Sequence, residues 1–439
     1  MNGSKICFSI FISSLLLVMS ACGAIPSLGG SAGEVVQSRA QRINDPQVAP
    51  VDLKELVASN NTFALDFYQD VRASSGNLFF SPYSLSSALA MTYAGARGIT
   101  ADQMAQVLHF SLPQDRLHPA FNSLDLQLGN EQKNRIGEGA SQPFQLDIAN
   151  QLWGQQDFPF LPPYIDLLQQ NYGAGLRLMD FIKSSEPSRK EINDWVSQKT
   201  HEKIQDLIPA GGINEFTRLV LTNAIYFKAD WTFPFEKNNT HDVPFTLLDG
   251  SQVNVPMMSF EDPNTLSYVE GLGVKAVELP YVGDTVSMWI LVPDQGAFAD
   301  FEASLNEQKL EDLLAHNQPV NLQVVLPKFE FTKEYQLSEV LSEMGMPDAF
   351  SESKADFSGM SEKYHLWIDQ VFHKAFVAVD EKGTEAAAAS AVVMRTESMP
   401  MQPKILTVDR PFIFLIRHKT SGSILFMGRV LDPRPDSGS

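Results

Sequence analysis

The chain has 439 residues, of which 44% are hydrophobic and 19% are charged, values that exclude a disordered or collagen-like protein. Its 33 basic and 52 acidic residues give a formal net charge of -19, so we expect no nucleic acid partner, because phosphate backbones are repelled by an acidic surface. Two cysteines, Cys7 and Cys22, exclude a disulfide-rich scaffold and a four-thiolate zinc site.

The first 21 residues are typical of an export signal. Lys5 is their only charge, and the apolar run from Ile6 to Val18 is too short to span a bilayer. Small residues then precede Cys22, which is similar to a bacterial lipobox. The sequence predicts a lipoprotein signal peptide over 1–21, cleaved before Cys22, whose sulfur would carry the lipid. The alternative is ordinary signal cleavage that leaves Cys22 as a free thiol.

The anchor would place an exported protein on a bacterial membrane, facing the periplasm or the cell exterior; without the anchor it would be extracellular. Residues 22–50 are rich in Gly, Ser, Ala and Pro, which predicts a flexible tether. Residues 51–435 contain no linker, charge block or internal repeat. They are therefore expected to form one domain.

The first part of this domain has helical periodicity. Apolar residues recur at three- and four-residue steps from Leu53 to Phe67, and Ser81-Pro82 indicates the start of a second helix. The later part is rich in strands, and the expected ones are 219–227, 286–292, 322–327, 372–379, 412–416 and 424–427. Helices and strands do not alternate regularly, so we expect an α+β fold rather than a doubly wound one.

The known enzyme motifs are absent or lack their structural context. The chain has no P-loop, and Gly271–Ala276, a loose match to a dinucleotide motif, precedes a strand instead of a helix. Residues 29–33 match the hydrolase pattern G-x-S-x-G but lie in the expected tether. We therefore expect no enzyme, no metal and no cofactor.

The segment 381–398 has the pattern of a strand in a loop position. Between Thr384 and Glu397 every charged residue has an odd number, whereas the even positions are uncharged and are small near the start. Alternate residues of a strand share one face, and no proline interrupts the run. A loop with the pattern of a buried strand is expected to have two states.

Several blocks of the chain together resemble the serpin superfamily over essentially all of 51–435. They are the segment 381–389, Asn77–Leu85, Thr222–Lys228 with Trp231, Leu326–Phe329, Asp356–Met360, His373–Ala375 and Asp409–Phe412. The resemblance implies a monomer of the α+β serpin fold, with about three β-sheets, eight to nine helices and an exposed reactive-centre loop at about 381–405.

The resemblance also implies a function. A serine protease, or possibly a cysteine protease, cleaves the exposed loop and forms an acyl-enzyme; the cut loop then inserts into the main sheet and traps the protease. Site roles carried over are the hinge (Glu381, Gly383, Thr384, Ala386, Ala388, Ser390), the shutter (Ser81, Ser84, Asn223, His373) and the breach (Trp231, Lys328). Glu381 is expected to pair with Lys328.

The position of the cleaved bond is left open between neighbouring residues. In the family it usually follows the seventeenth residue counted from the hinge glutamate, which gives Glu397–Ser398. The alternatives are Arg395–Thr396, which suits a trypsin-like protease, and Met394, Met399 or Met401, which suit elastase- or subtilisin-like ones. The runner-up function is that of a non-inhibitory serpin that binds or carries a ligand, and small hinge residues without proline favour inhibition instead.

Overall fold

A computed structural model describes residues 34–36, 38–134, 144–384 and 402–435, all within one compact unit. Its helices are α1 (Pro50–Val71), α2 (Pro82–Tyr93), α3 (Gly98–Val107), α4 (Gln114–Glu131), α5 (Pro162–Tyr172), α6 (Phe181–Lys199), α7 (Phe298–Ala303), α8 (Glu307–Ala315) and α9 (Leu337–Glu343), with two 3-10 turns, η1 (Lys237–Asn239) and η2 (Pro347–Phe350). The helix expected from Leu53 is α1, and the one expected at Ser81-Pro82 is α2. Within the described ranges, no helix has the length and apolarity needed to cross a bilayer.

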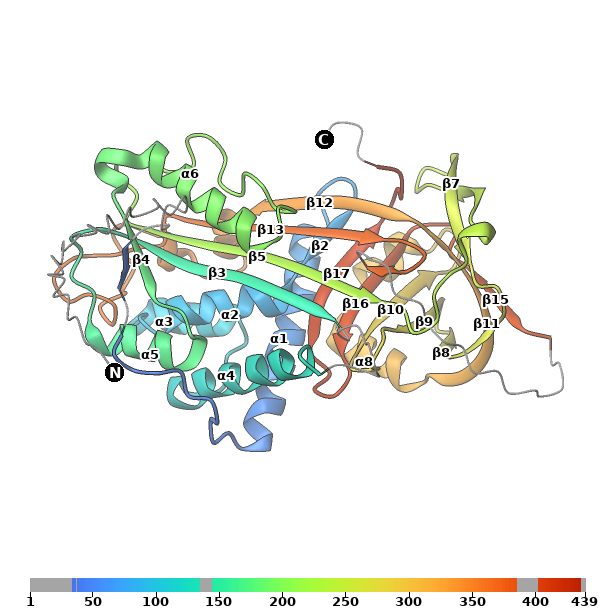
Figure 1. Ribbon diagram of the computed structural model, residues 1–439, viewed down its shortest axis with the longest axis horizontal. Coiled ribbons are helices and arrows are strands. Elements are labelled where there is room, and N and C mark those ends of the chain that lie inside the picture. Colours follow the sequence, from blue (N-terminus) through green and yellow to red (C-terminus); the bar gives the residue numbers. More distant parts are fainter. Residues whose placement is uncertain (1–33, 37, 135–143, 385–401, 436–439) are drawn as a thin grey trace, which may run out of the picture. The chain divides into compact units, whose positions relative to one another are not determined.

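Seven strands form the first of two sheets. In spatial order they are β1 (Glu34–Val36), β4 (Leu176–Met179), β3 (Gln145–Gln155), β5 (Leu219–Asp230), β14 (Gly383–Thr384), β13 (Gln370–Val379) and β12 (Phe329–Gln336). Helix α6 covers one face of this sheet, and α2, α4 and α5 lie on the other side (Figure 1). Strand β5 is buried on both faces, as its continuous apolar sequence predicts.

The second sheet contains ten strands. They are β2 (Leu78–Phe80), β17 (Ile424–Val430), β16 (Phe412–His418), β10 (Val286–Pro293), β9 (Val274–Pro280), β8 (Asn264–Gly271), β11 (Gln318–Pro327), β7 (Gln252–Ser259) and β6 (His241–Thr246), with β15 (Lys404–Thr407) beside β11. The expected third sheet is the β15-β11-β7-β6 end of this one. It is continuous with the rest because β11 pairs with β8 through its first half and with β15 and β7 through its second.

The two faces of the seven-stranded sheet pack into different cores. Odd-numbered residues of β5, such as Leu221 and Ile225, face the large core that includes α1, α2 and the ten-stranded sheet. Val220 and Ala224 face a smaller core beneath α6. The alternation along one strand therefore separates two environments, and any strand added beside β5 must match both.

One sequence expectation is wrong for the described residues of 22–50. Glu34–Val36 form strand β1, and residues 38–48 bond to the helices α4 and α5. Composition predicted a flexible tether because few of these residues are apolar, but here ordering comes from main-chain pairing and polar side chains. Cys22 and residues 1–33 lie outside the described residues.

Candidate functional site

The candidate site is the seam between β5 and β13, two parallel strands of the seven-stranded sheet. They pair directly over the six residue pairs from Gln370–Val220 to Ala375–Ile225. Beyond these pairs the short strand β14 lies between them and pairs antiparallel with both. The seam is thus closed at one end and already holds part of a third strand at the other.

Residues 380–384, the hinge turn, carry the chain from β13 into β14. Asp380 N donates to Gly383 O at 2.9 Å, and the Asp380 carboxylate accepts from the backbone N–H groups of Lys382 and Gly383 at 2.8 and 3.2 Å. Outside the turn, Trp231 N donates to Lys382 O at 2.7 Å and Phe235 N donates to Glu381 O at 2.8 Å. The hinge turn is therefore held on both sides by main-chain hydrogen bonds.

Gly383 is required here by close packing. A Cβ atom at this position would lie 2.0 Å from the carbonyl oxygen of Ala229 and 2.8 Å from Cα of Asp230, distances that no side chain tolerates. The sequence predicted this glycine for its conformational freedom at a bend. The structure gives a different reason, the approach of the β14 backbone to β5.

Thr384 is already buried, with 2% of its surface exposed. It pairs with Ala229 on one side and Val379 on the other, and its Oγ1 lies 2.6 Å from the Tyr281 hydroxyl. Tyr281 in turn stacks on Trp231 with ring centroids 4.5 Å apart. Thr384 is the first even-numbered residue that is predicted to enter the sheet, and it is therefore already buried between β5 and β13.

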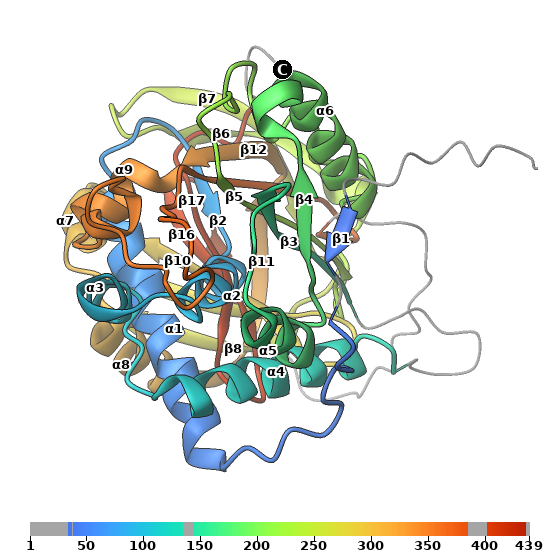
Figure 2. The ribbon, with the colours of Figure 1, turned by 90° about the vertical axis from the view of Figure 1, so that its left-hand side faces the viewer.

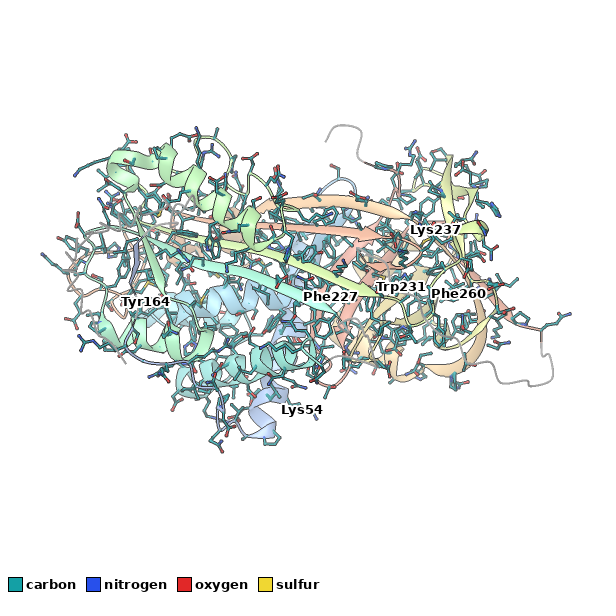
Figure 3. The ribbon with its side chains drawn as sticks, viewed as in Figure 1. Lys54, Tyr164, Phe227, Trp231, Lys237 and Phe260 are labelled. Atoms are coloured by element: carbon teal, nitrogen blue, oxygen red, sulfur yellow. The ribbon has the colours of Figure 1, made fainter. Side chains whose placement is uncertain are left out.

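Trp231 contacts both the hinge turn and Tyr281 at this end of the seam. Its indole Nε1 donates to Asp380 O at 3.0 Å, so the ring holds the hinge turn as well as the Tyr281 ring. Ring contacts run from Phe227 to Tyr281, Trp231, Phe235 and Phe260 in turn. Figure 3 labels Phe227, Trp231 and Phe260 along this line. Burial of the Tyr281 hydroxyl raises its pKa, which keeps the group protonated and able to donate.

Glu381 makes the ion pair that the sequence suggested. Lys328 Nζ donates to Glu381 Oε2 at 2.8 Å, and Thr240 Oγ1 donates to Oε1 at 2.8 Å. Burial alone would raise the pKa of Glu381, but these two hydrogen bonds and the Lys328 charge hold the pKa below its usual value. The carboxylate thus stays charged and ties the hinge turn to the ten-stranded sheet.

The four residues assigned to the shutter come together beneath the closed part of the seam. Ser81 N donates to His373 Nε2 at 3.3 Å, and His373 Nδ1 bonds Asn223 Oδ1 across the β5–β13 boundary. Asn223 Nδ2 donates to Ser84 Oγ at 2.7 Å. The network connects β5, β13 and the start of α2, where Ser81 is the N-cap.

Asn150 belongs to the same network, although sequence reasoning missed it. Its Oδ1 accepts from Ser84 Oγ at 3.0 Å and from Asn223 Nδ2, and it lies opposite Asn223 in the β3–β5 register. A usable signal was present, because residues 146, 148 and 152 are apolar and Asn150 is the one polar residue in that alternation.

His373 is neutral in this network. The side chain is fully buried, and burial lowers its pKa to about 3, although the bond to Asn223 opposes that shift. A ring that accepts from Ser81 N at Nε2 carries its proton on Nδ1, where it donates to Asn223. The network therefore has one consistent set of donors and acceptors.

The other predicted site residues lie outside the described residues. These are Cys22 and the loop positions Ala386, Ala388, Ser390, Met394, Arg395, Thr396, Glu397, Ser398 and Met399, because the description stops at Thr384 and resumes at residue 402. Beyond the gap, β15 pairs in parallel with β11. The hinge turn and β15 thus mark where the predicted loop leaves and rejoins the body.

Comparison with known proteins assigns the architecture. A family model described as serpin, serine protease inhibitor, matches residues 58–433. This chain is a serpin. The leukocyte elastase inhibitor of Xenopus tropicalis is 39% identical over 388 residues, which cover 87% of this chain and 100% of the relative. The family is described as one of serine protease inhibitors, which are not enzymes, and this relative is named as an inhibitor.

Solved serpin structures share the fold. Uncleaved ovalbumin aligns with a TM-score of 0.76 at 26% identity and covers 86% of this chain and 100% of its own. Human thyroxine-binding globulin, solved with its hormone, aligns with a TM-score of 0.76 at 29% identity and covers 87% of this chain and 99% of its own. The serpin fold therefore accommodates both relatives named as inhibitors and one named for binding a small molecule.

Proposed function

We propose that this serpin is a suicide inhibitor of a serine protease that works by inserting its cleaved loop into the seam between β5 and β13. The protease serine attacks the loop carbonyl, the peptide bond breaks, and the loop stays attached to the enzyme as an ester. The new strand then extends from β14 and carries the acyl-enzyme along the sheet. Trapping follows because insertion is faster than hydrolysis of the ester.

The single observation that carries this proposal is the position of β14. Thr384 pairs with Ala229, and continuing this antiparallel register places Ser390 opposite Asn223 and Met394 opposite Leu219. Residues paired across two strands point to the same face. The even loop residues would therefore face the large core, as Ala229, Leu221 and Leu219 do. The odd residues, including the charged Glu385, would face α6.

The same register bears on the reactive bond. Strand β5 begins at Leu219, so a loop inserted as far as Met394 fills the whole length of β5. We propose Glu397–Ser398 as the cleaved bond, because the acyl-carrying residue then lies just beyond the filled seam. Cleavage at Arg395–Thr396 or after Met394 or Met399 would end the inserted strand within a few residues of the same place.

The second candidate is a non-inhibitory serpin that binds a ligand, favoured by the thyroxine-binding globulin likeness. The seam supports the first function over the second. A carrier does not need a strand already started in the sheet, whereas an inhibitor benefits from one because the first residue pairs need no further opening. The small hinge residues and the seated Thr384 favour inhibition.

We further propose that the protein acts outside the cytoplasm, anchored through lipidated Cys22 to a bacterial membrane and facing the periplasm or the cell exterior. The lipobox-like Cys22 supports this, as does the absence of other cysteines beyond Cys7. Labelling with a radioactive fatty acid would test it. Label in the wild-type protein and none in Cys22→Ala is the expected result, and equal label in both would contradict it.

The function is tested with a panel of serine proteases of elastase-, trypsin- and subtilisin-like specificity. We expect a covalent complex that resists denaturant, together with a C-terminal fragment whose mass identifies the cleaved bond. The fragment should leave only on denaturation, since β15, β16 and β17 are integral to the ten-stranded sheet. Cleavage by every protease without a covalent band would favour the carrier function instead.

A further inference from the structure

A cavity of about 700 Å³ lies beside one edge of β3 in the seven-stranded sheet. β4 pairs with β3 only from Trp153 to Gln155, so the first part of β3 has no neighbouring strand on this side within the described ranges. The cavity is lined by residues 38–42, β3, the end of α5 with the start of β4, and the end of α6. Figure 2 shows β4 running from α5 toward α6, with β1 beside it.

Four of the residues that line this cavity are cationic, and none is an Asp or a Glu. They are Arg39 and Arg42 from the segment before α1, Arg177 from β4 and Lys199 from the end of α6. The whole chain, in contrast, has a formal net charge of -19. A cavity lined by charges of one sign attracts ions of the other sign. We call this cavity the cationic pocket.

Arg177 is held in place by two aromatic rings. Its Cζ lies 5.7 Å from the ring centroid of Trp153 and 5.5 Å from that of Trp195 on α6. Burial lowers the pKa of Arg177, and the charge of Glu191 partly opposes that shift. The guanidinium therefore remains charged but has lost part of its hydration, which a bound anion would replace. Because a guanidinium has five N–H donors, an arginine that interacts with one carboxylate still has donors for another anion.

Arg42 is also fixed by its surroundings. Its Nε donates to Asn122 Oδ1 at 2.9 Å, and its Nη2 pairs with the Asp125 carboxylate. Asn122 is fully buried on α4. These two bonds use two of the five N–H donors of the guanidinium and hold it beside the pocket. The arginine precedes residue 58, where the family match begins.

The carboxylates near the pocket do not balance its cations. Asp125 and Glu191 each act on one arginine, and Asp166 accepts a hydrogen bond from a serine hydroxyl at the rim. None of the three lines the pocket. Arg39 and Lys199 are exposed, and neither takes part in an ion pair within the described ranges. Positive charge is therefore in excess inside the pocket.

We propose that the cationic pocket binds the phosphate group of an organic phosphate. Arginine forks and a lysine ammonium are the side chains that bind phosphate oxygens best. The volume lies within the range of small-molecule sites and exceeds that of inorganic phosphate. Tyr172 and Trp195 line the same pocket and offer aromatic surface to the organic part. The inference does not depend on inhibition, because β3 and β5 separate the pocket from the seam.

The phosphate group has two chemical sources, a soluble phosphate ester and a phospholipid headgroup. Cys22 lies 12 positions before Glu34, where β1 begins, and a chain of that length spans at most about 40 Å. The proposed lipid on Cys22 would hold the pocket within reach of a membrane surface that carries anionic headgroups. The experiment therefore has one arm for each source.

Both arms use the full chain with Cys22→Ala, so that a lipid anchor cannot contribute. The first arm titrates glycerol phosphate by calorimetry, with acetate as the carboxylate control. The second measures co-sedimentation with phosphatidylcholine vesicles that contain or lack phosphatidylglycerol. Lys199→Glu is compared with Lys183→Glu. Lys183 is exposed near the start of the same helix and does not line the pocket, so both variants change the net charge equally.

We expect Lys199→Glu to weaken binding about tenfold and Lys183→Glu to leave it unchanged, because only the first places a carboxylate among the bound oxygens. Arg39→Ala should weaken binding a few-fold, and added salt should weaken it in every protein. Glycerol phosphate binding alone would identify a soluble ester as the ligand. Binding to phosphatidylglycerol vesicles that Lys199→Glu removes and Lys183→Glu retains would identify the lipid headgroup.

Three results would overturn the phosphate site. The first is no binding in either arm, and the second is an equal loss in Lys199→Glu and Lys183→Glu, which would show that only net charge matters. The third is an affinity for acetate equal to that for glycerol phosphate. Each of these results would leave the inhibitory function untouched. Urea unfolding should give the same midpoint for both variants, since both side chains are exposed.

Discussion

The two ends of the β5–β13 seam differ in what keeps them in place. At the breach end the strands are already apart, and β14 fills the space with main-chain bonds, Gly383 lying against Ala229 and Thr384 against Tyr281. At the shutter end the strands pair directly, and a buried polar network through His373 and Asn223 joins them. β14 thus separates β5 from β13 at the breach end, whereas β5 and β13 pair directly at the shutter end.

For the proposed inhibition, this difference predicts the direction and the cost of insertion. Extending β14 toward the shutter would add main-chain pairs one residue at a time. Residues 226–228 of β5 have no direct partner on β13, so a β5–β13 pair must separate at each step only from Ile225 onward. The parallel pairs that are lost are replaced by antiparallel pairs on both sides of the new strand, so the sheet gains hydrogen bonds in total. The shutter network is the main side-chain obstacle on this path.

The largest effect is expected at the open end. Thr384→Arg should abolish the covalent protease complex and leave a loop that is still cleaved, because a charged side chain cannot occupy the buried position beside Tyr281. Glu385→Arg is the matched control, since the odd positions are predicted to face the other side of the sheet. A normal stoichiometry of inhibition in Thr384→Arg would refute the prediction that the even-numbered loop residues become buried.

An intermediate effect is expected at the closed end, as a function of pH. Burial lowers the pKa of His373 from 6.5 to about 3, so the unfolded chain takes up this proton at a higher pH than the folded one. The stability from the neutral ring is present above pH 6.5 and is lost as the pH falls toward 3. We expect the free energy of unfolding to fall by about 2 kcal/mol from this group between pH 7 and 5.

Urea unfolding of the wild-type protein and His373→Asn at both pH values measures this contribution. The variant starts from a lower stability but should lose about 2 kcal/mol less between the two pH values. His118, whose pKa burial lowers to about 4, should contribute the same slope in both proteins. Identical slopes in wild type and His373→Asn would show that the shutter ring is not what titrates.

The smallest effect is expected from loss of the Tyr281 hydroxyl, which bonds the Thr384 side chain. Tyr281→Phe keeps the stack on Trp231 and removes the hydrogen bond to Thr384. The loss should destabilise the buried position of Thr384 between β5 and β13 by about 1 kcal/mol. The number of inhibitor molecules consumed per protease should rise a few-fold. In a Thr384→Val background the same change should have almost no further effect, because both partners of the bond are then gone.

Several elements could be predicted from local sequence. The apolar run at 219–227 predicted a central strand, and the alternation that begins at Thr384 predicted a buried side chain at that residue. Asn223 and His373 were placed through the resemblance, whereas Asn150 stands out in the sequence only as a polar residue in an apolar alternation, which does not identify Asn223, 73 residues away, as its partner. A cross-strand partner is set by register, which local pattern does not encode.

By itself the sequence determined the fold class and the central strand, because these depend on hydrophobic period, and the resemblance to the serpin family supplied four residues of the shutter. Only the tertiary structure decided that Thr384 is already buried, that Gly383 is needed for the close approach of β14 to β5, and that the chain before α1 is bonded to α4 and α5. Each of these depends on which distant backbones come into contact. Composition describes how readily a segment is solvated, whereas an unpaired strand edge and a buried Asn122 can order even a polar segment.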